Sequence, residues 1–166
     1  MTNTTPYDQT AGGRTTAPGA AAPVRILYGT HTGTSQMLAQ ETSRYLQQAG
    51  TPTIVTDMES FDPGDLPGLR RLVIIVSTDG DGEPPLMAEG LLEYLRGAAA
   101  PRLPGLRYGV VALGDTRYYR FCQAGRDFDT ELRRLGAARV MERQDLDTDY
   151  EDGFQKWLLS VPEALG

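Results

Sequence analysis

The run LVIIV from Leu72 to Val76 limits the possible folds of this chain more than any other segment, because every residue in it is apolar and most are β-branched. A strand without a polar face must be buried on both sides, which is typical of a central strand in a parallel sheet covered by helices. Further strand-like runs are predicted at Val24 to Tyr28, Thr53 to Asp57, Tyr108 to Leu113 and Ala138 to Met141. The sequence therefore predicts five strands.

The segments between these strands carry apolar side chains at helical spacing. Leu38, Thr42 and Leu46 share one face of a predicted helix, and Phe154 and Trp157 begin the apolar stripe of the last one. Strands that alternate with helices, without an internal repeat, predict an α/β fold: a doubly wound, five-stranded parallel sheet in the order 2-1-3-4-5. Ligands bind such a sheet beyond the carboxyl ends of its strands, beside the point where the strand order reverses.

Length and composition predict one folded domain, residues 23–166, preceded by a tail. Residues 1–22 are rich in Thr, Gly, Ala and Pro and lack the apolar core of a signal peptide, so we expect them to be disordered. No apolar run in the 166 residues approaches the length of a membrane span, which predicts no membrane association. The net charge of −6 argues against nucleic acid as a partner.

The scarcity of cysteine and histidine excludes several kinds of chemistry. Cys122 is the only cysteine and His31 the only histidine, so an internal disulfide is impossible, and a metal centre or a Ser-His-Asp triad is not expected. A lone thiol is compatible with a reducing cytoplasm, where we expect the protein to reside. His31 is most simply a loop residue that faces solvent.

The segment from Thr30 to Ser35 joins the first strand to a helix and predicts a phosphate-binding loop. Glycine lets the backbone approach an anion closely, and the first turn of a helix offers free N–H groups and a positive dipole end. No Lys follows Gly33, and the patterns of nucleoside-triphosphate and dinucleotide loops are missing. The alternative is an ordinary strand-to-helix turn, with Thr34 or Ser35 as the N-cap.

Two further loops should converge on the same edge of the sheet. The loop after the third strand contains two Asp-Gly pairs between Asp79 and Gly82, which allow tight turns that present backbone N–H groups. The loop after the fourth strand places Tyr118 at the sheet edge, where it could stack on a planar ligand. A polar surface loop and a tyrosine that simply covers the next helix remain the alternatives.

Together the three loops resemble the FMN loops of flavodoxins. The matching motifs are Thr30-x-Thr32-Gly33-Thr34, Ser77-Thr78-x-Gly80-x-Gly82-Glu83-Pro84-Pro85 and Leu113-Gly114-Asp115-x-x-Tyr118-x-x-Phe121-Cys122. The chain resembles in particular the flavodoxin-like domains of sulfite reductase flavoprotein and cytochrome P450 reductase, and small stand-alone flavodoxin-like proteins. The resemblance extends from about Val24 to about Val161. The short link after Met141 is similar to the short-chain form.

The resemblance implies FMN as the cofactor and assigns three groups of residues to it. The phosphate would be held by Thr30, His31, Thr32, Gly33, Thr34 and Ser35. The isoalloxazine ring would lie between Ser77, Thr78, Asp79 and Gly80 on one side and Leu113, Gly114, Asp115, Tyr118, Phe121 and Cys122 on the other, with Tyr118 stacked and Asp147 nearby. Asp79 departs from the pattern, because relatives commonly carry Tyr or His there.

These features predict an FMN-binding electron carrier, or the FMN domain of an NADPH-dependent oxidoreductase. It would take electrons from an NAD(P)H-linked flavoprotein reductase and pass them to a redox acceptor protein. An acidic surface at the flavin edge would dock these partners; its residues are Asp79, Asp81, Glu83, Asp115, Asp145, Asp147, Asp149, Glu151 and Asp152. The alternative, motivated by Asp79, is a flavodoxin-fold interaction or regulatory module with weakened or lost FMN binding. A phosphoacceptor receiver is disfavoured, since Tyr28-Gly29-Thr30 offers no carboxylate.

Overall fold

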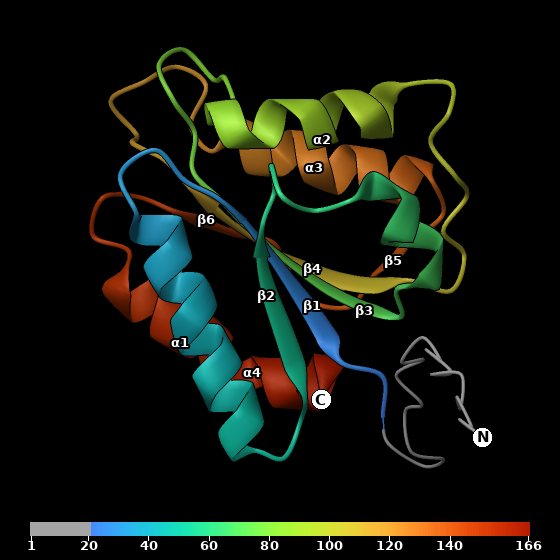
Figure 1. The fold of residues 1–166 in the computed structure, drawn as a ribbon. Helices are drawn as coiled ribbons and strands as arrows, with labels where there is room; N and C mark the ends of the chain where they lie inside the picture. The colour runs from blue at the N-terminus through green and yellow to red at the C-terminus, as the bar shows by residue number, and fades with distance from the viewer. Residues whose placement is uncertain (1–20) are drawn as a thin grey trace, which may run out of the picture.

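A parallel sheet in the order β2-β1-β3-β4-β5 runs through the middle of the molecule (Figure 1). The computed structural model describes residues 21–166, so the predicted tail at 1–22 lies outside the described residues except for its last two positions. The strands are β1 (Val24–Gly29), β2 (Thr53–Asp57), β3 (Arg71–Val76), β4 (Arg107–Leu113), β5 (Ala138–Arg139) and β6 (Gln144–Leu146). All of their pairings are parallel, which confirms the predicted doubly wound sheet.

Helices cover both faces of this sheet. The helices are α1 (Thr34–Gln48), α2 (Leu86–Arg96), α3 (Gln123–Arg134) and α4 (Glu151–Leu165), and a short 3-10 turn, η1 (Pro63–Gly68), precedes β3. Figure 1 shows α1 and α4 on one face and α2 and α3 on the other. The buried side chains divide in the same way into two apolar clusters, one on each side of the strands.

Strand β3 has the burial that its sequence predicts. All six of its residues are buried; Leu72, Ile74 and Val76 pack under α2 and α3, whereas Val73 and Ile75 pack under α1 and α4. Full burial of a branched aliphatic side chain stabilises the fold by about 1.5–3 kcal/mol. The central strand therefore holds both helical layers in place.

The fifth position of the sheet differs from the prediction. Instead of one strand from Ala138 to Met141, two short strands, β5 and β6, pair with different parts of β4, which gives six strands in residues 21–166. Between them Met141 is buried, and its Sδ lies 3.1 Å from the position that a Cβ on Gly109 would take. The Met141 side chain thus fills the space above Gly109, between the two short strands.

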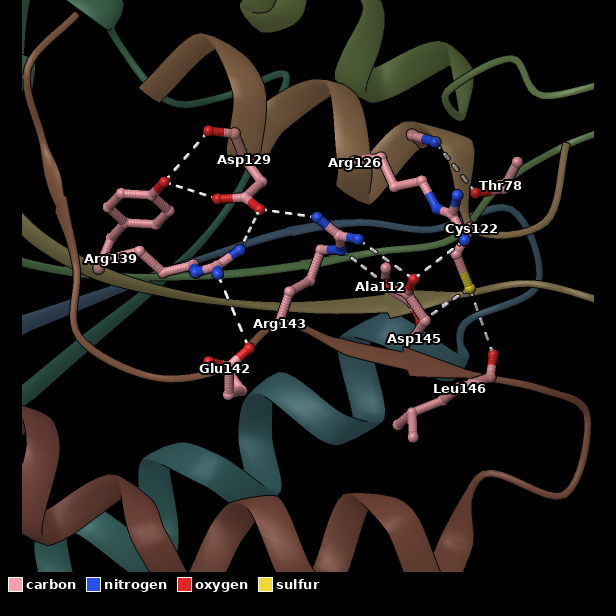
Figure 2. A network of polar contacts seen from close by, with 12 residues as sticks. Thr78, Ala112, Cys122, Arg126, Asp129, Arg139, Glu142, Arg143, Asp145 and Leu146 are labelled. Carbon is pink, nitrogen blue, oxygen red and sulfur yellow. Dashed lines mark hydrogen bonds and ion pairs between the residues drawn. The ribbon is translucent and has the colours of Figure 1, made fainter. Parts of the chain in front are cut away.

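A buried carboxylate fastens this broken edge to α3. Asp129 is only 2% exposed and accepts hydrogen bonds from the Tyr108 hydroxyl at 2.6 Å and from Arg139 and Arg143 at 2.7 Å each (Figure 2). Burial alone would raise the pKa of Asp129, but the Tyr108 hydroxyl and the guanidinium groups outweigh it and lower that pKa. Arg143 also donates to Asp145 at 2.7 Å, which extends the network to β6.

Replacement of Asp129 by Asn should destabilise the fold by about 3–5 kcal/mol, because the buried carboxylate charge is lost and two partly buried guanidinium groups lose their shared counter-charge. The change would be measured by urea unfolding. Asp127→Asn on the same helix is the control: Asp127 pairs with the half-exposed Arg96, and that pair should contribute less than about 1 kcal/mol.

The same variant should change the response of stability to acid. The folded pKa of Asp129 lies below the unfolded value of about 3.9, so its stabilisation is present above that value and is lost as pH falls through the folded pKa. Asp129→Asn should therefore flatten the loss of stability below about pH 4. Equal unfolding free energies for Asp129→Asn and Asp127→Asn would contradict this description of the network.

Candidate functional site

The loops that follow β1, β3 and β4 open into one pocket of about 540 Å³ at the carboxyl edge of the sheet. Of the residues predicted from the sequence, the pocket is lined by His31, Thr32, Thr34, Ser77, Thr78, Asp79, Gly80, Leu113, Gly114, Asp115, Tyr118 and Asp147. Five others do not line it: Thr30, Gly33, Ser35, Phe121 and Cys122. Thr148 and Tyr150 line it as well and were not predicted, although the loop after β6 exits at the same edge.

The first loop leaves the start of α1 open to an anion. Gly33 is the N-cap, with a left-handed φ of 96°, and no side chain caps the helix, so neither Thr34 nor Ser35 is the N-cap. The Gly33 N–H donates to Thr30 Oγ1 at 2.8 Å, which shapes the turn. The N–H groups of the first helical turn have no intrahelical partners. This geometry matches a phosphate-binding loop rather than a side-chain-capped turn.

Two buried hydroxyl groups at this edge are unpaired. Among residues 21–166, Ser35 Oγ and Ser77 Oγ are buried and have no hydrogen-bond partner. A buried polar group without a partner costs about 1–3 kcal/mol, so such a group usually has a ligand or water as its partner. Ser35 lies in the first turn of α1, and Ser77 directly follows β3 and lines the pocket. The residues present thus fit a phosphate ester with a polar ring system.

The second loop folds into a tight turn between Asp79 and Glu83. The Asp79 N–H donates to the Glu83 carbonyl at 2.8 Å, and the Gly82 N–H donates to the Asp79 carbonyl at 2.9 Å. Gly80 and Gly82 both have positive φ, 42° and 122°, as the Asp-Gly pairs predict. Thr78 Oγ1 accepts from the Ala124 N–H at 3.2 Å, which connects this loop to the start of α3.

A contact between His31 and Asp79 connects the first loop to the second. His31 Nδ1 lies 3.3 Å from Asp79 Oδ2, and the two side chains are 71% and 31% exposed. The expected exposure of His31 is confirmed, but the sequence did not indicate this contact. Asp79 is therefore held against the phosphate loop, and its charge lies beside an imidazole.

The third loop is fixed by its own carboxylate and by the loop after β6. Arg117 donates from its backbone and its guanidinium to Asp115, and these hydrogen bonds lower the pKa of Asp115 to about 2. The hydroxyl and backbone N–H of Thr116 both donate to Asp147, whose pKa is lowered, chiefly by the Thr116 hydroxyl. Asp147 therefore holds two walls of the pocket together.

Cys122 lies beneath the third loop and supports it. Its thiol is buried and donates to the carbonyls of Ala112 at 3.2 Å and Leu146 at 3.6 Å, so it joins β4 to β6 (Figure 2). The Leu146 carbonyl also accepts from the Gly114 N–H at 2.9 Å. Burial raises the pKa of the Cys122 thiol to about 12. The thiol is thus a structural group rather than a nucleophile at neutral pH.

The acidic side chains around the pocket are not arranged as a metal centre. Among residues 21–166, no group of three or more His, Cys, Asp or Glu side chains is placed to hold a metal ion. None of the helices in this part of the chain has the length and apolar character needed to cross a membrane.

Comparison with known proteins identifies the class. The model of the flavodoxin family matches residues 26–157. The chain is 42% identical over 149 residues to the sulfite reductase [NADPH] flavoprotein alpha-component of Bacillus subtilis, covering 90% of this chain and 25% of that protein. The corresponding protein of Vibrio cholerae is 39% identical over 150 residues, and the match covers 90% of this chain and 24% of that protein. The chain thus spans about a quarter of the length of these relatives.

Solved structures agree with this result. A flavodoxin of Streptococcus pneumoniae superposes with a TM-score of 0.77 at 30% identity, covering 87% of this chain and 97% of that one. A short-chain flavodoxin associated with a bacterial microcompartment has the same TM-score and coverage at 23% identity, which supports the fold alone. The chain belongs to the flavodoxin family. It is an FMN-binding electron-transfer domain.

We expect Cys122 to resist thiol reagents in the folded protein, because burial raises its pKa to about 12 and keeps it protonated at pH 8. Alkylation by iodoacetamide at pH 8, followed by mass spectrometry, should be at least about 100-fold slower in buffer than in concentrated urea. Equal rates in the two conditions would show that the third loop does not cover the thiol.

Proposed function

We propose that this domain accepts electrons from an NAD(P)H-linked flavoprotein reductase and passes them to a redox acceptor protein. The observation that carries the proposal is the pocket that joins the three loops and contains the unpaired Ser77 hydroxyl. When bound, FMN supplies the redox chemistry, while the protein controls its potential and its access to partners. No general base or nucleophile is needed, in agreement with the inert Cys122.

The described residues suggest how the cofactor would be held. The open first turn of α1 and the Thr32 and Thr34 side chains would hold the phosphate. The ring would lie between the Asp79 loop and Tyr118, which is 52% exposed and lines the pocket. Phe121 and Cys122 would support this wall from below rather than touch the ring.

The names of the relatives support a reductase-linked role, since they are NADPH-dependent flavoprotein components of sulfite reductase. The acidic surface proposed to dock these partners has fewer free carboxylates than the nine that the sequence predicts. Four of its nine carboxylates contact other side chains of this chain: Asp79, Asp115, Asp145 and Asp147. The exposed acidic groups that could face a basic partner are Asp81, Glu83, Asp149, Glu151 and Asp152. We place the domain in the cytoplasm, where a free thiol stays reduced.

Fluorescence titration of flavin-free protein with FMN tests the proposal, with two neighbouring tyrosines as a matched pair. Tyr118→Leu should weaken FMN binding about tenfold, because the ring would lose aromatic stacking of about 1 kcal/mol and some buried area. Tyr119→Leu should leave the affinity unchanged, since Tyr119 lies outside the pocket lining. A yellow protein with flavin absorbance bands is expected on purification.

The outcome also separates the electron carrier from the second candidate function. Asp79, paired with His31 and unable to stack on a ring, favours a module with weakened or lost FMN binding. A colourless protein that does not quench FMN fluorescence would support that module and would overturn the carrier. Equal effects of the two Tyr substitutions would contradict the proposed position of the ring.

Asp79→Tyr should tighten FMN binding and raise the potential of the second one-electron reduction. Stacking of the new tyrosine on the flavin ring should stabilise the complex by about 1 kcal/mol, or about fivefold in Kd. Removal of the Asp79 carboxylate should raise the potential by at most about 100 mV, which is the value for a unit charge about 6 Å from the ring at an effective dielectric constant of about 20. The imidazole of His31 beside Asp79 should keep the change below that bound. Potentiometric titration with reference dyes measures the shift, and Asp81→Asn, an exposed acid of the same loop, is the control.

A further inference from the structure

The tip of the third loop projects into solvent beside the pocket. Tyr119 is fully exposed, and the side chain of Arg117 is 81% exposed. Single exposed aromatic residues are common on protein surfaces, but tyrosine and arginine are also the residue types enriched where proteins bind one another. The tip therefore has the composition of a contact surface.

This tip is ordered by the chain itself. Arg117 donates to Asp115 Oδ1 from its backbone N–H and from Nε, at 2.9 Å each, and the Tyr118 N–H donates to the Asp115 carbonyl at 3.0 Å. A surface that is already ordered loses less conformational freedom on binding. Because Asp115 neutralises Arg117, the positive charge available to a partner belongs to the next arginine, Arg120.

A recess of about 510 Å³ lies beside the tip; it is lined by Tyr119, Arg120, Phe121, Gln123 and Arg126 and shares no lining residue with the flavin pocket. Within residues 21–166, no carboxylate lies within 4.0 Å of the Arg120 guanidinium. The aliphatic stem of Arg120 packs on the second loop: its Cδ lies 2.7 Å from the position that a Cβ on Gly82 would take. The second loop thus supports Arg120 at the recess.

The second arginine of the recess has only a shared counter-charge. Arg126 Nη2 lies 3.2 Å from Asp145 Oδ2, but Asp145 also accepts from Arg143 at 2.7 Å (Figure 2). Arg126 is half-exposed, and Arg143 is mostly buried. The lining of the recess therefore includes two arginines and no carboxylate, on a chain whose net charge is −6.

We propose that this recess binds a carboxylate side chain of a redox partner protein, with Tyr119 packing on the partner beside it. Guanidinium groups bind carboxylates in a planar, two-pronged geometry, which suits a Glu or Asp on a protruding partner loop. The exposed Asp81 and Glu83 lie on the neighbouring second loop. The surface beside the flavin pocket therefore has an acidic side, at the second loop, and a basic side, at the recess. Such a surface orients a partner of complementary charge over the flavin edge. This inference rests on the proposed function, because electron transfer is what would bring a partner protein to this surface.

The test is an NMR titration of the ¹⁵N-labelled full chain with hexaglutamate at low ionic strength, with hexalysine as the charge-reversed probe. Hexaglutamate should shift the backbone amides of residues 119–126, and hexalysine should shift those around Asp81 and Glu83. Arg120→Gln should weaken hexaglutamate binding about threefold to fivefold, as expected for one exposed ion pair. Arg133→Gln, an exposed arginine at the other end of α3, is the matched control and should leave binding unchanged.

Three results would overturn the proposal: no shifts at residues 119–126, shifts distributed over other basic residues, or equal weakening by Arg120→Gln and Arg133→Gln. Both substitutions are at exposed positions, and unchanged dispersion of the remaining amide signals shows that each variant is folded. The titration needs no flavin. Failure of this inference is therefore distinguishable from failure of FMN binding, which the absorbance spectrum and the FMN titration decide.

Discussion

The parallel alignment of the strands determines where the functional loops lie. A parallel strand can be followed only by a crossover, so every strand-to-helix loop leaves the sheet at the same edge. The alignment is stable here because β3 is buried on both faces, with Ile74 under one pair of helices and Ile75 under the other. Three loops that lie far apart in the sequence are thereby brought to one pocket.

That pocket is lined mainly by hydroxyl-bearing and acidic side chains, and α3 supports it. The start of α3 holds the second loop through Thr78, and Cys122 connects β4 to β6 under the third loop. The buried Asp129 holds the β5–β6 edge to the same helix through Arg139 and Arg143. A site of this kind binds and positions a cofactor, and it leaves the redox chemistry to that cofactor.

Sequence patterns predict β3, which is apolar throughout, and the helices, which are apolar on one face. Through the loop motifs they also predict most of the pocket lining. They do not predict features that depend on contacts between distant segments. Gln144–Leu146 is too short and too polar to be recognised as a strand, and its polar residue Asp145 contacts arginines from outside the strand, Arg126 and Arg143. The contact between His31 and Asp79 likewise requires two loops to meet, so no local pattern indicates it.

If the loops after β1, β3, β4 and β6 form one cofactor site, a single FMN molecule must affect all four of them together. Amide chemical-shift mapping of the flavin-free, ¹⁵N-labelled chain on addition of FMN measures this. We expect one set of shifts, saturating together at one FMN per chain, at residues 31–35, 77–80, 113–118 and 147–150. Shifts confined to the first loop, or saturating at different FMN concentrations in different loops, would contradict a single site.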